Sequence, residues 1–479
     1  MTGFIVPVYT SAMLPFRSQL LRVTFMAICS IAIGLSIQFA LAQSLSPSQD
    51  DASAFRRPER ALEGGAISFT PTYTIDLPLI LQNYPVMHEV RALWISRFDW
   101  TTSHHTVTTT DIDTIVNNVA SAHFNMILFQ IRGTADAFYS STLEPWASRL
   151  TGEVTRTLGQ SPGFDPLAVM IDRAHAQGIQ VHAYMNVYPT WLCDSIGPIT
   201  NTTPQHPFWQ WTAQSPSTYG SKTFFWREWS NTSLQPMNLI PTSQGGTCGS
   251  PDYLGGYLWA SPAVTIVQSH ILSVAIDLAT RYDIDGLHLD NVRYSGSNYS
   301  SDPTTHQAFT AVHTLSPTLV YTTWLPNFQR AQVSNLVVQI YSATTAEKPN
   351  LWISAAVWPN YTSGTNTYFQ DSKGWLANGS VDANMPMLYS SDVINDLSAW
   401  TNRAQDFVND AHGRYIIPGI SGDYTNFNDI VDRINAARSI GAAGVAVFSY
   451  GALNARNYWD DLANGPFATP AIIPQPNWK

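Results

Sequence analysis

The stretch that decides the fold is YDIDGLHLDNVRY, residues 282–294. A helix-like run over 262–282 ends just before it, and its middle has the pattern of a short apolar strand. Because side chains alternate along a strand, His288 and Asp290 should lie on one face and the intervening leucines on the other. An acid at the carboxyl end of a parallel strand is typical of a chemical site in a (β/α)8 barrel. A buried aspartate that caps a loop would give the same local pattern.

Short apolar strands alternate with helical stretches from Val86 onward, which is the signature of β/α units. The helices are well delimited, as at Asp165-Pro166, where an N-cap residue precedes a proline at the first helical position. The expected strands are 90–96, 125–131, 180–186, 286–292, 351–357, 383–389, 415–421 and 444–450. Eight such strands predict an α/β fold, a (β/α)8 TIM barrel with a long insertion between strands 3 and 4, rather than an open doubly wound sheet.

The amino-terminal region has the composition of an export signal. Arg17 and Arg22 precede an apolar run that ends in Ala-Leu-Ala before Gln43, the order of a basic, a hydrophobic and a cleavage region. The run is also long enough to be a retained membrane anchor. We expect a signal peptide over 1–42, cleavage after Ala42, and a secreted or periplasmic protein that has no other membrane segment.

The remaining chain divides by composition into three parts. Residues 43–85 are rich in Ser, Pro and Ala and are expected to form a linker or amino-terminal arm. Residues 86–465 should form the barrel, and residues 466–479 a carboxyl-terminal tail.

Cys193 and Cys248 are the two cysteines beyond the signal region. In an exported protein they predict a disulfide bond, with two free buried thiols as the alternative.

Charge and aromatic content narrow the classes of partner. Charged residues make up 12% of the chain, the net charge is −10, and no basic run is present, so nucleic acid is not an expected partner. The 16 tryptophans are numerous enough both to fill a core and to stack on sugar rings. The chain contains neither a Gly-x-Ser-x-Gly elbow nor a Gly-rich phosphate loop, which argues against serine-hydrolase and nucleotide chemistry.

Polar side chains recur on one face of neighbouring strands near their carboxyl ends. The shared faces are expected to carry Gln130 with Arg132, then His182 with Tyr184 and Asn186, and then His288 with Asp290. Because the carboxyl ends of parallel strands meet at one rim, this pattern predicts a polar bowl at the top of a barrel.

Carboxylates, amides and aromatic rings around one bowl suit a ring-shaped, polyhydroxylated substrate, and glycoside cleavage requires two carboxyl groups. We predict Asp290 as the general acid/base, with Asp136 or Glu144 as its partner. Sugar hydroxyls would be positioned by Gln130, Arg132, His182, Tyr184, Asn186, His288 and Arg293. Stacking would be provided by Trp94, Trp100, Trp358 and Tyr389.

Two other functions fit the same residues. A carbohydrate-binding barrel without catalysis would use the same bowl. A metal-dependent hydrolase could bind a cation through His182, His288 and Asp290, although the first strand lacks the His-x-His pair common in such barrels. We therefore expect a polysaccharide or oligosaccharide partner and neither a cofactor nor a metal; the pattern does not indicate an oligomeric state.

Several segments, in order, resemble the bacterial glycosyl hydrolase-like 10 family over about residues 86–455. They include EVRALWIS (89–96), FNMILFQIR (124–132), VHAYMN (181–186) and DGLHLD (285–290). The resemblance implies an exported (β/α)8 barrel that acts on glycan strands, and some relatives cleave peptidoglycan glycan stripped of its peptides.

The chain departs from that family at one position. The family usually has a second acid directly after the position of Asp290, where this chain has Asn291. Because strand alternation should turn Asn291 away from the barrel lumen, we expect Asp290 to be the essential acid.

Overall fold

The computed structural model describes residues 87–102, 104–152, 157–192, 201–237 and 256–479. The chain divides into two units, Met1–Ile80 and Leu81–Lys479, and every described residue belongs to the second. The expected signal peptide, the 43–85 segment and both members of the predicted disulfide, Cys193 and Cys248, lie outside the described residues. Among the described residues, no helix is both long and apolar enough to cross a bilayer.

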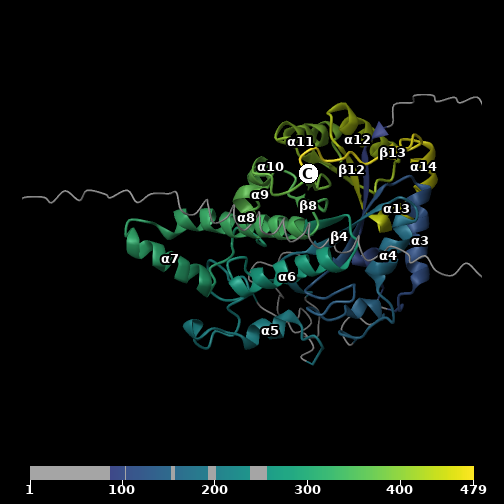
Figure 1. The fold of residues 1–479 in the computed structure, drawn as a ribbon. Helices are drawn as coiled ribbons and strands as arrows, with labels where there is room; N and C mark the ends of the chain where they lie inside the picture. The colour runs from purple at the N-terminus through teal and green to yellow at the C-terminus, as the bar shows by residue number, and fades with distance from the viewer. Residues whose placement is uncertain (1–86, 103, 153–156, 193–200, 238–255) are drawn as a thin grey trace, which may run out of the picture. The chain divides into compact units, whose positions relative to one another are not determined.

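A curled sheet of nine parallel strands forms the centre of the described chain (Figure 1). Its strands are β2 (Val90–Ile95), β3 (Met126–Arg132), β4 (Gln180–Asn186), β7 (Gly286–Asp290), β8 (Trp352–Val357), β9 (Ala383–Pro386), β10 (Tyr415–Ile416), β11 (Gly419–Ser421) and β12 (Gly444–Phe448). Their order is β10-β9-β8-β7-β4-β3-β2-β12-β11. The predicted α/β fold with a parallel sheet of β/α units is therefore confirmed.

The strand expected over 415–421 is divided into two. β10 pairs with β9, and β11 pairs with β12. The interruption falls at Ile417-Pro418, because proline has no N–H to donate to a strand ladder. The carbonyl of Pro418 still accepts a hydrogen bond from the amide of Ala446 at 3.0 Å. The two edge strands of the sheet are thus separated by two residues of chain.

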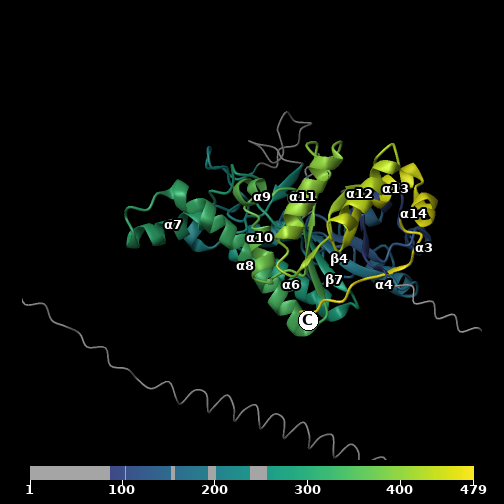
Figure 2. The same ribbon diagram turned by 90° about the horizontal axis from the view of Figure 1, so that it is seen from above.

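Helices cover the outer face of the sheet (Figures 1 and 2). The longer ones are α3 (Thr109–Ser121), α4 (Pro166–His175), α6 (Thr265–Arg281), α8 (Tyr321–Glu347), α11 (Leu397–Asn409) and α12 (Asn428–Ser439); the shorter are α2 (Arg97–Trp100), α9 (Tyr361–Thr367), α10 (Ser372–Ala377), α13 (Tyr450–Arg456) and α14 (Trp459–Asn464). The predicted start of α4 is confirmed, since the Asp165 carboxylate accepts hydrogen bonds from the amides of Leu167 and Ala168.

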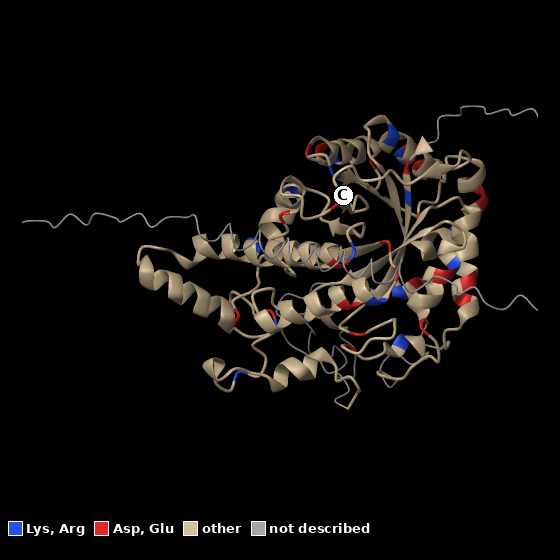
Figure 3. Cartoon of the chain, viewed as in Figure 1, with Lys and Arg blue, Asp and Glu red and all other residues tan. Residues whose placement is uncertain are grey.

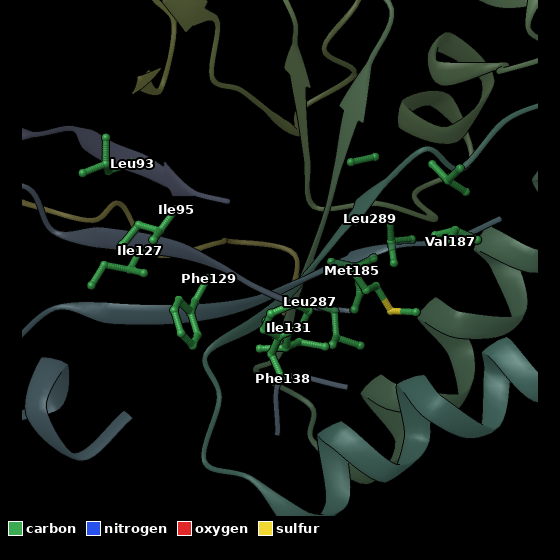
Figure 4. Close-up of a cluster of buried hydrophobic side chains, with 14 of the residues drawn as sticks. Leu93, Ile95, Ile127, Phe129, Ile131, Phe138, Met185, Val187, Leu287 and Leu289 are labelled. Carbon is green, nitrogen blue, oxygen red and sulfur yellow. The ribbon is translucent and has the colours of Figure 1, made fainter. Parts of the chain in front are cut away.

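Strand alternation divides the apolar side chains into two layers. Outward-facing residues such as Ile127, Met185 and Leu287 pack against the helices (Figure 4). Inward-facing residues, among them Trp94 and Tyr184, form a second cluster inside the curl. The two leucines of the YDIDGLHLDNVRY stretch belong to the outer layer, so the face assignment made from the sequence is confirmed.

Two long connections leave the sheet on either side of β7. Between β4 and β7 the chain forms β5 (Pro189–Leu192), α5 (Pro207–Ala213), the 3-10 turn η2 (Ser217–Tyr219) and β6 (Tyr257–Trp259) before α6. β5 and β6 pair antiparallel with each other. Between β7 and β8 the chain forms α7 (Pro303–Leu315) and α8, and charged side chains are absent from α7 (Figure 3).

The last described residues return to the sheet. β13 (Ala471–Ile472) pairs in parallel with β1 (Met87–His88). Farther along, the indole N–H of Trp478 donates to the buried carboxylate of Asp382 at 2.7 Å, and the Lys479 ammonium lies 2.9 Å from the same carboxylate. The segment expected to be a tail therefore makes ordered contacts with β9 and its surroundings.

Gly286 should tolerate no side chain, because it lies opposite His182 across the β4–β7 pair. A Cβ at this position would approach His182 Nδ1 to 2.4 Å, and overpacking of this kind costs about 1–3 kcal/mol. We expect Gly286→Ala to lower the free energy of unfolding in urea by about that amount. The control is Gly364→Ala, whose Cβ would make ordinary contacts at 3.4 and 3.5 Å. Equal stability of the two variants would contradict the packing argument.

Candidate active site

Asp290 lies at the carboxyl end of β7, at the rim formed by the carboxyl ends of the sheet strands. Its carboxyl oxygens accept hydrogen bonds from the Tyr184 hydroxyl at 2.7 Å and from the Asn291 amide at 2.6 Å. Burial raises the pKa of Asp290, and the Tyr184 hydrogen bond and the Arg293 charge oppose this rise without cancelling it. Asp290 therefore faces inward, as predicted, and keeps its proton to a higher pH than an ordinary aspartate.

His288 lies one layer below Asp290 and is held on both ring nitrogens. Its Nε2 accepts from the Trp94 indole N–H at 3.0 Å, and its Nδ1 lies 2.9 Å from the Ser354 hydroxyl. Because an indole N–H can only donate, Nδ1 carries the ring proton. Burial lowers the pKa of His288 to about 3, so the ring is neutral. Both nitrogens are engaged within the protein, so His288 has none to offer a cation.

His182 lies in the lowest of these layers. It pairs across the sheet with Gly286, whereas Asn186 pairs with Asp290. Burial lowers the pKa of His182 to about 4. The structure therefore does not bring His182 to Asp290. Among the described residues, no group of three His, Cys, Asp or Glu side chains could hold a metal ion.

An aromatic platform, formed by Trp94, Tyr389 and Phe448, lies beside Asp290. The Tyr389 and Phe448 rings stack at 5.1 Å with an interplanar angle of 17°, and Trp94 contacts both edge-on. Phe448 leaves 37% of its surface exposed, which makes it one of the more exposed large apolar side chains. The platform thus brings Trp94 and Tyr389 together as candidates for stacking and adds Phe448, which the sequence analysis did not select.

The other two predicted tryptophans lie elsewhere. Trp100 is buried on the outer side of the sheet, where its ring lies 5.2 Å from that of Phe129. Trp358 is half-buried, and its ring lies 5.4 Å from the Arg293 guanidinium. Trp358 therefore contacts Arg293, a residue of the site, whereas Trp100 packs on the other side of the sheet.

Asn291 is brought into the site by its backbone. Its φ of 50° lies in the left-handed region, so the residue leaves the alternation of β7. Its side-chain nitrogen Nδ2 donates to Asn186 Oδ1 at 3.1 Å, and its side-chain oxygen Oδ1 accepts from Arg293 Nη2 at 3.1 Å. The expectation that Asn291 would turn away from the lumen side is wrong, because strand alternation ends at Asp290.

Asp136 reaches the same rim beside Gly133. The Asn186 amide donates to the Gly133 carbonyl at 3.0 Å. A Cβ on Gly133 would come within 2.9 Å of Arg97 Cδ and 3.1 Å of Asp136 Oδ1, so these two side chains meet over the glycine. The backbone amide of Arg97 also donates to Gln130 Oε1 at 2.8 Å. Gln130, Asn186 and Asp136 are thus brought together.

Arg132 does not share the inward face of Gln130, so this prediction is wrong. A β-bulge between the two residues pairs Gln130 with Tyr184 but Arg132 with the outward-facing Met185. An extra residue in a strand reverses the alternation beyond it. Arg132 is fully buried and forms a bidentate ion pair with Glu144 at 2.8–3.0 Å.

Glu144 is enclosed by that ion pair. It is 1% exposed, and His270 Nε2 of α6 donates to its Oε1 at 2.9 Å. Burial by itself would raise the pKa of Glu144, but the Arg132 charge and the His270 hydrogen bond outweigh burial and lower the pKa to about 2. Of the two predicted partners of Asp290, the structure brings Asp136 to the rim and places Glu144 behind it.

Several residues around the site carried no recognisable sequence signal. Arg97, Tyr257, Trp259 and Tyr368 come from loops or short elements, where no period assigns a face. Glu228 also belongs to this group. It is fully buried, accepts a hydrogen bond from the Ser295 amide at 3.1 Å, and burial raises its pKa to about 8. Its position next to Ser295, in the segment that follows β7, depends on tertiary folding.

Glu144→Gln should destabilise the fold, because it leaves the Arg132 charge buried without its partner; such losses cost about 3–5 kcal/mol. A carboxylate whose folded pKa is lowered stabilises the protein above its ordinary pKa of about 4.3, and that contribution is lost as the pH falls toward 2. Urea unfolding of wild type and variant from pH 7 to pH 3 measures both effects. Asp136→Asn, at the rim, is the control and should lose less than about 1.5 kcal/mol. A wild-type free energy of unfolding in Glu144→Gln would contradict this role.

Solved structures share this architecture. The glycoside hydrolase domain of PgaB (BpsB) from Bordetella bronchiseptica superposes with a TM-score of 0.55 at 11% identity, covering 81% of this chain and all of that one. The catalytic domain of a β-amylase from Paenibacillus polymyxa gives a TM-score of 0.50 at 10% identity, covering 77% and 94%. At these identities the likeness shows only that this chain shares the α/β fold of those two domains.

Sequence relatives extend the likeness to most of the chain. Glycosyl hydrolase YngK of Bacillus subtilis (strain 168) is 23% identical over 455 residues, which cover 85% of this chain and 77% of the relative. Glycosyl hydrolase DigH of Escherichia coli (strain K12) is 24% identical over 332 residues, covering 63% and 65%. The model of the glycosyl hydrolase-like 10 family matches residues 89–412. Because this match includes more than half of the chain, the protein belongs to the glycosyl hydrolase-like 10 family.

Proposed function

We propose that the protein is an exported glycoside hydrolase that cleaves O-glycosidic bonds in a polysaccharide by acid/base catalysis. The observation that carries the proposal is the position of Asp290. Its carboxyl lies at the rim of a parallel α/β sheet, is held by Tyr184, and adjoins an aromatic platform. Cleavage of a glycosidic bond requires a positioned proton donor, and an aromatic surface beside it suits the binding of a sugar ring.

In this proposal Asp290 protonates the glycosidic oxygen as the bond to the leaving sugar breaks. Burial raises the pKa of Asp290, which keeps the acid form available to a higher pH than for an ordinary aspartate. Tyr184 holds one carboxyl oxygen in place with its hydroxyl. The rate should therefore fall as the pH rises through the pKa of Asp290.

Asp136 is the proposed second carboxylate, acting as base or nucleophile. One of its oxygens accepts from the backbone amide of Thr134 at 2.7 Å, which orients the carboxylate at the rim. Glu144 is the less suitable candidate, because Arg132 and His270 occupy its oxygens away from the rim. Gln130 and Asn186 would position sugar hydroxyls near Asp136.

The Tyr389–Phe448 platform is the proposed stacking surface for a sugar ring, because apolar C–H faces pack on aromatic rings. The proposed substrate is a glycan strand. Peptidoglycan glycan freed of its peptides is the first substrate to test, because the family resemblance implies that some members cleave it. The same platform would serve a carbohydrate-binding barrel without catalysis, so binding alone does not separate the two functions.

We further propose that the curled sheet is a closed eight-stranded barrel in which 415–421 acts as one interrupted strand. Two hydrogen bonds support continuity across the interruption: Ala443 N–H donates to the Ile416 carbonyl at 2.9 Å, and Ala446 N–H to the Pro418 carbonyl at 3.0 Å. The connection between β4 and β7 would then be the insertion between the third and fourth strands. Closure would bring the carboxyl ends of all strands to one rim.

Asp290→Asn should abolish turnover, with a loss of at least about 100-fold in kcat, because removal of a positioned general acid typically costs this much. The measurement is the release of reducing ends from peptide-free peptidoglycan strands and from a panel of bacterial and plant polysaccharides. The exposed Asp460→Asn is the matched control. Wild-type turnover in Asp290→Asn would refute the assignment. Glycan binding by wild type without release of reducing ends would favour the binding barrel instead.

Export also has a direct test. The basic residues at 17 and 22, the apolar run and the Ala-Leu-Ala site support cleavage before Gln43, and an oxidising compartment favours a Cys193–Cys248 disulfide. Mass spectrometry of protein recovered outside the cytoplasm should find an amino terminus at Gln43 and one disulfide-linked peptide. Retention of the apolar run, or alkylation of both cysteines without reductant, would contradict the respective part of this proposal.

A further inference from the structure

A chain of hydrogen bonds runs along the rim beside Asp290 and passes through the side chains of Asn186 and Asn291. It begins at the Gly133 carbonyl, which accepts from the side-chain nitrogen Nδ2 of Asn186. Asn186 Oδ1 in turn accepts from Asn291 Nδ2 at 3.1 Å. Asn291 Oδ1 then accepts from Arg293 Nη2 at 3.1 Å. The carbonyl and the amino end of one side chain thus join β4 to the segment that follows β7.

The local backbone makes this bridge possible. Asn291 adopts φ 50°, a left-handed conformation that asparagine tolerates better than most residues. The turn sends its side chain back over the strand end, and its own amide N–H donates to Asp290 Oδ1 at 2.6 Å. The residue that contacts the catalytic carboxyl through its backbone therefore contacts Asn186 and Arg293 through its side chain.

Besides the charges of Asp290 and Glu228, the contacts of Arg293 with other described residues are ring faces and one carbonyl. Its guanidinium lies 5.0 Å from the Trp259 ring, 5.4 Å from Trp358 and 4.9 Å from Tyr368. Its Nη1 donates to the Tyr294 carbonyl at 3.3 Å, and its buried Nε has no hydrogen-bond partner among the described residues. Rings restrain the plane of a guanidinium but leave its rotation within that plane free. The hydrogen bond to Asn291 Oδ1, the shorter of the two that the guanidinium donates, restrains that rotation together with the bond to the Tyr294 carbonyl.

We propose that Asn291 is the positioning residue of this site: its side chain holds Arg293 and Asn186 in fixed places beside Asp290. The role rests on the proposed acid function of Asp290. Asn291 itself makes no chemical step, because a carboxamide neither gives nor takes a proton at neutral pH. It acts through the charge of Arg293 and through the orientation of the Asn186 amide.

The charged and titratable groups around Asp290 determine what displacement of Arg293 would do. They are Tyr184 from β4, Arg293 from the segment after β7, Arg97 from α2, and Tyr389 from the segment after β9. Burial raises the pKa of Asp290, while the positive charges of Arg293 and Arg97 lower it. If Arg293 moves away, one of the two opposing charges is lost, so the pKa of Asp290 should rise further.

The test replaces Asn291 by glycine, which accepts the left-handed backbone and keeps the amide bond to Asp290 while removing the side chain. The protein is labelled with 13C at its aspartate side-chain carboxyl carbons, and the signal absent from Asp290→Asn identifies Asp290. We expect Asn291→Gly to raise the titration midpoint of Asp290 by about half to one pH unit. On a cleaved glycan, kcat should fall about 10-fold with a smaller change in KM, because the acid is less well placed.

A double variant decides whether Asn291 acts through Arg293. Arg293→Met should raise the midpoint as well, and Asn291→Gly added to it should cause no further rise. The control is Asn457→Gly, the same substitution at an exposed asparagine with φ 54°, which should titrate like wild type. A wild-type midpoint in Asn291→Gly, or an equal rise in both backgrounds, would overturn the proposal. Because the carboxyl titrates without turnover, an inactive wild-type protein would refute the proposed enzyme and not this positioning role.

Discussion

The register between β4 and β7 is the constraint on which the rest of the site depends. It pairs His182 with Gly286, Tyr184 with His288 and Asn186 with Asp290. Since side chains on one face recur every two residues, each pair forms a layer inside the curled sheet. A slip of one residue would place leucines inside and turn the acid toward the helices. The absence of a side chain at Gly286 leaves room for the His182 ring. The His182–Gly286 layer therefore helps to hold the register that places Asn186 beside Asp290.

Two carboxyl groups near the rim have opposite electrostatic environments. Glu144 is fully buried yet ionised, because Arg132 and His270 compensate for the loss of water and lower its pKa to about 2. Asp290 is held by a hydroxyl, an amide and the charges of two arginines, which do not overcome burial, so its pKa is raised. Similar side chains thus divide into an ionised carboxylate and a carboxyl that keeps its proton to a higher pH, according to their neighbours rather than their identity.

Much of this arrangement could be predicted from local pattern. The eight strand regions, the α4 cap and the inward face of Asp290 follow from periodicity and capping chemistry, which act over a few residues. The errors in assigning side chains to strand faces lie where that periodicity is interrupted. The bulge before Arg132 turned its side chain outward, and the left-handed turn at Asn291 turned its side chain inward. Neither irregularity has a glycine or proline to announce it.

The sequence by itself therefore determined the class of the fold and the residue at the end of β7, because both depend on spacing along the chain, and the resemblance of its segments indicated the family. The tertiary structure decided which side chains surround that residue. Arg97, Phe448 and Arg293 come from different segments of the chain, and Glu144 is held away from the rim by Arg132 and by His270 of α6. Contacts between distant segments depend on how the sheet curls and how the loops fold over it, and no period in the sequence records them.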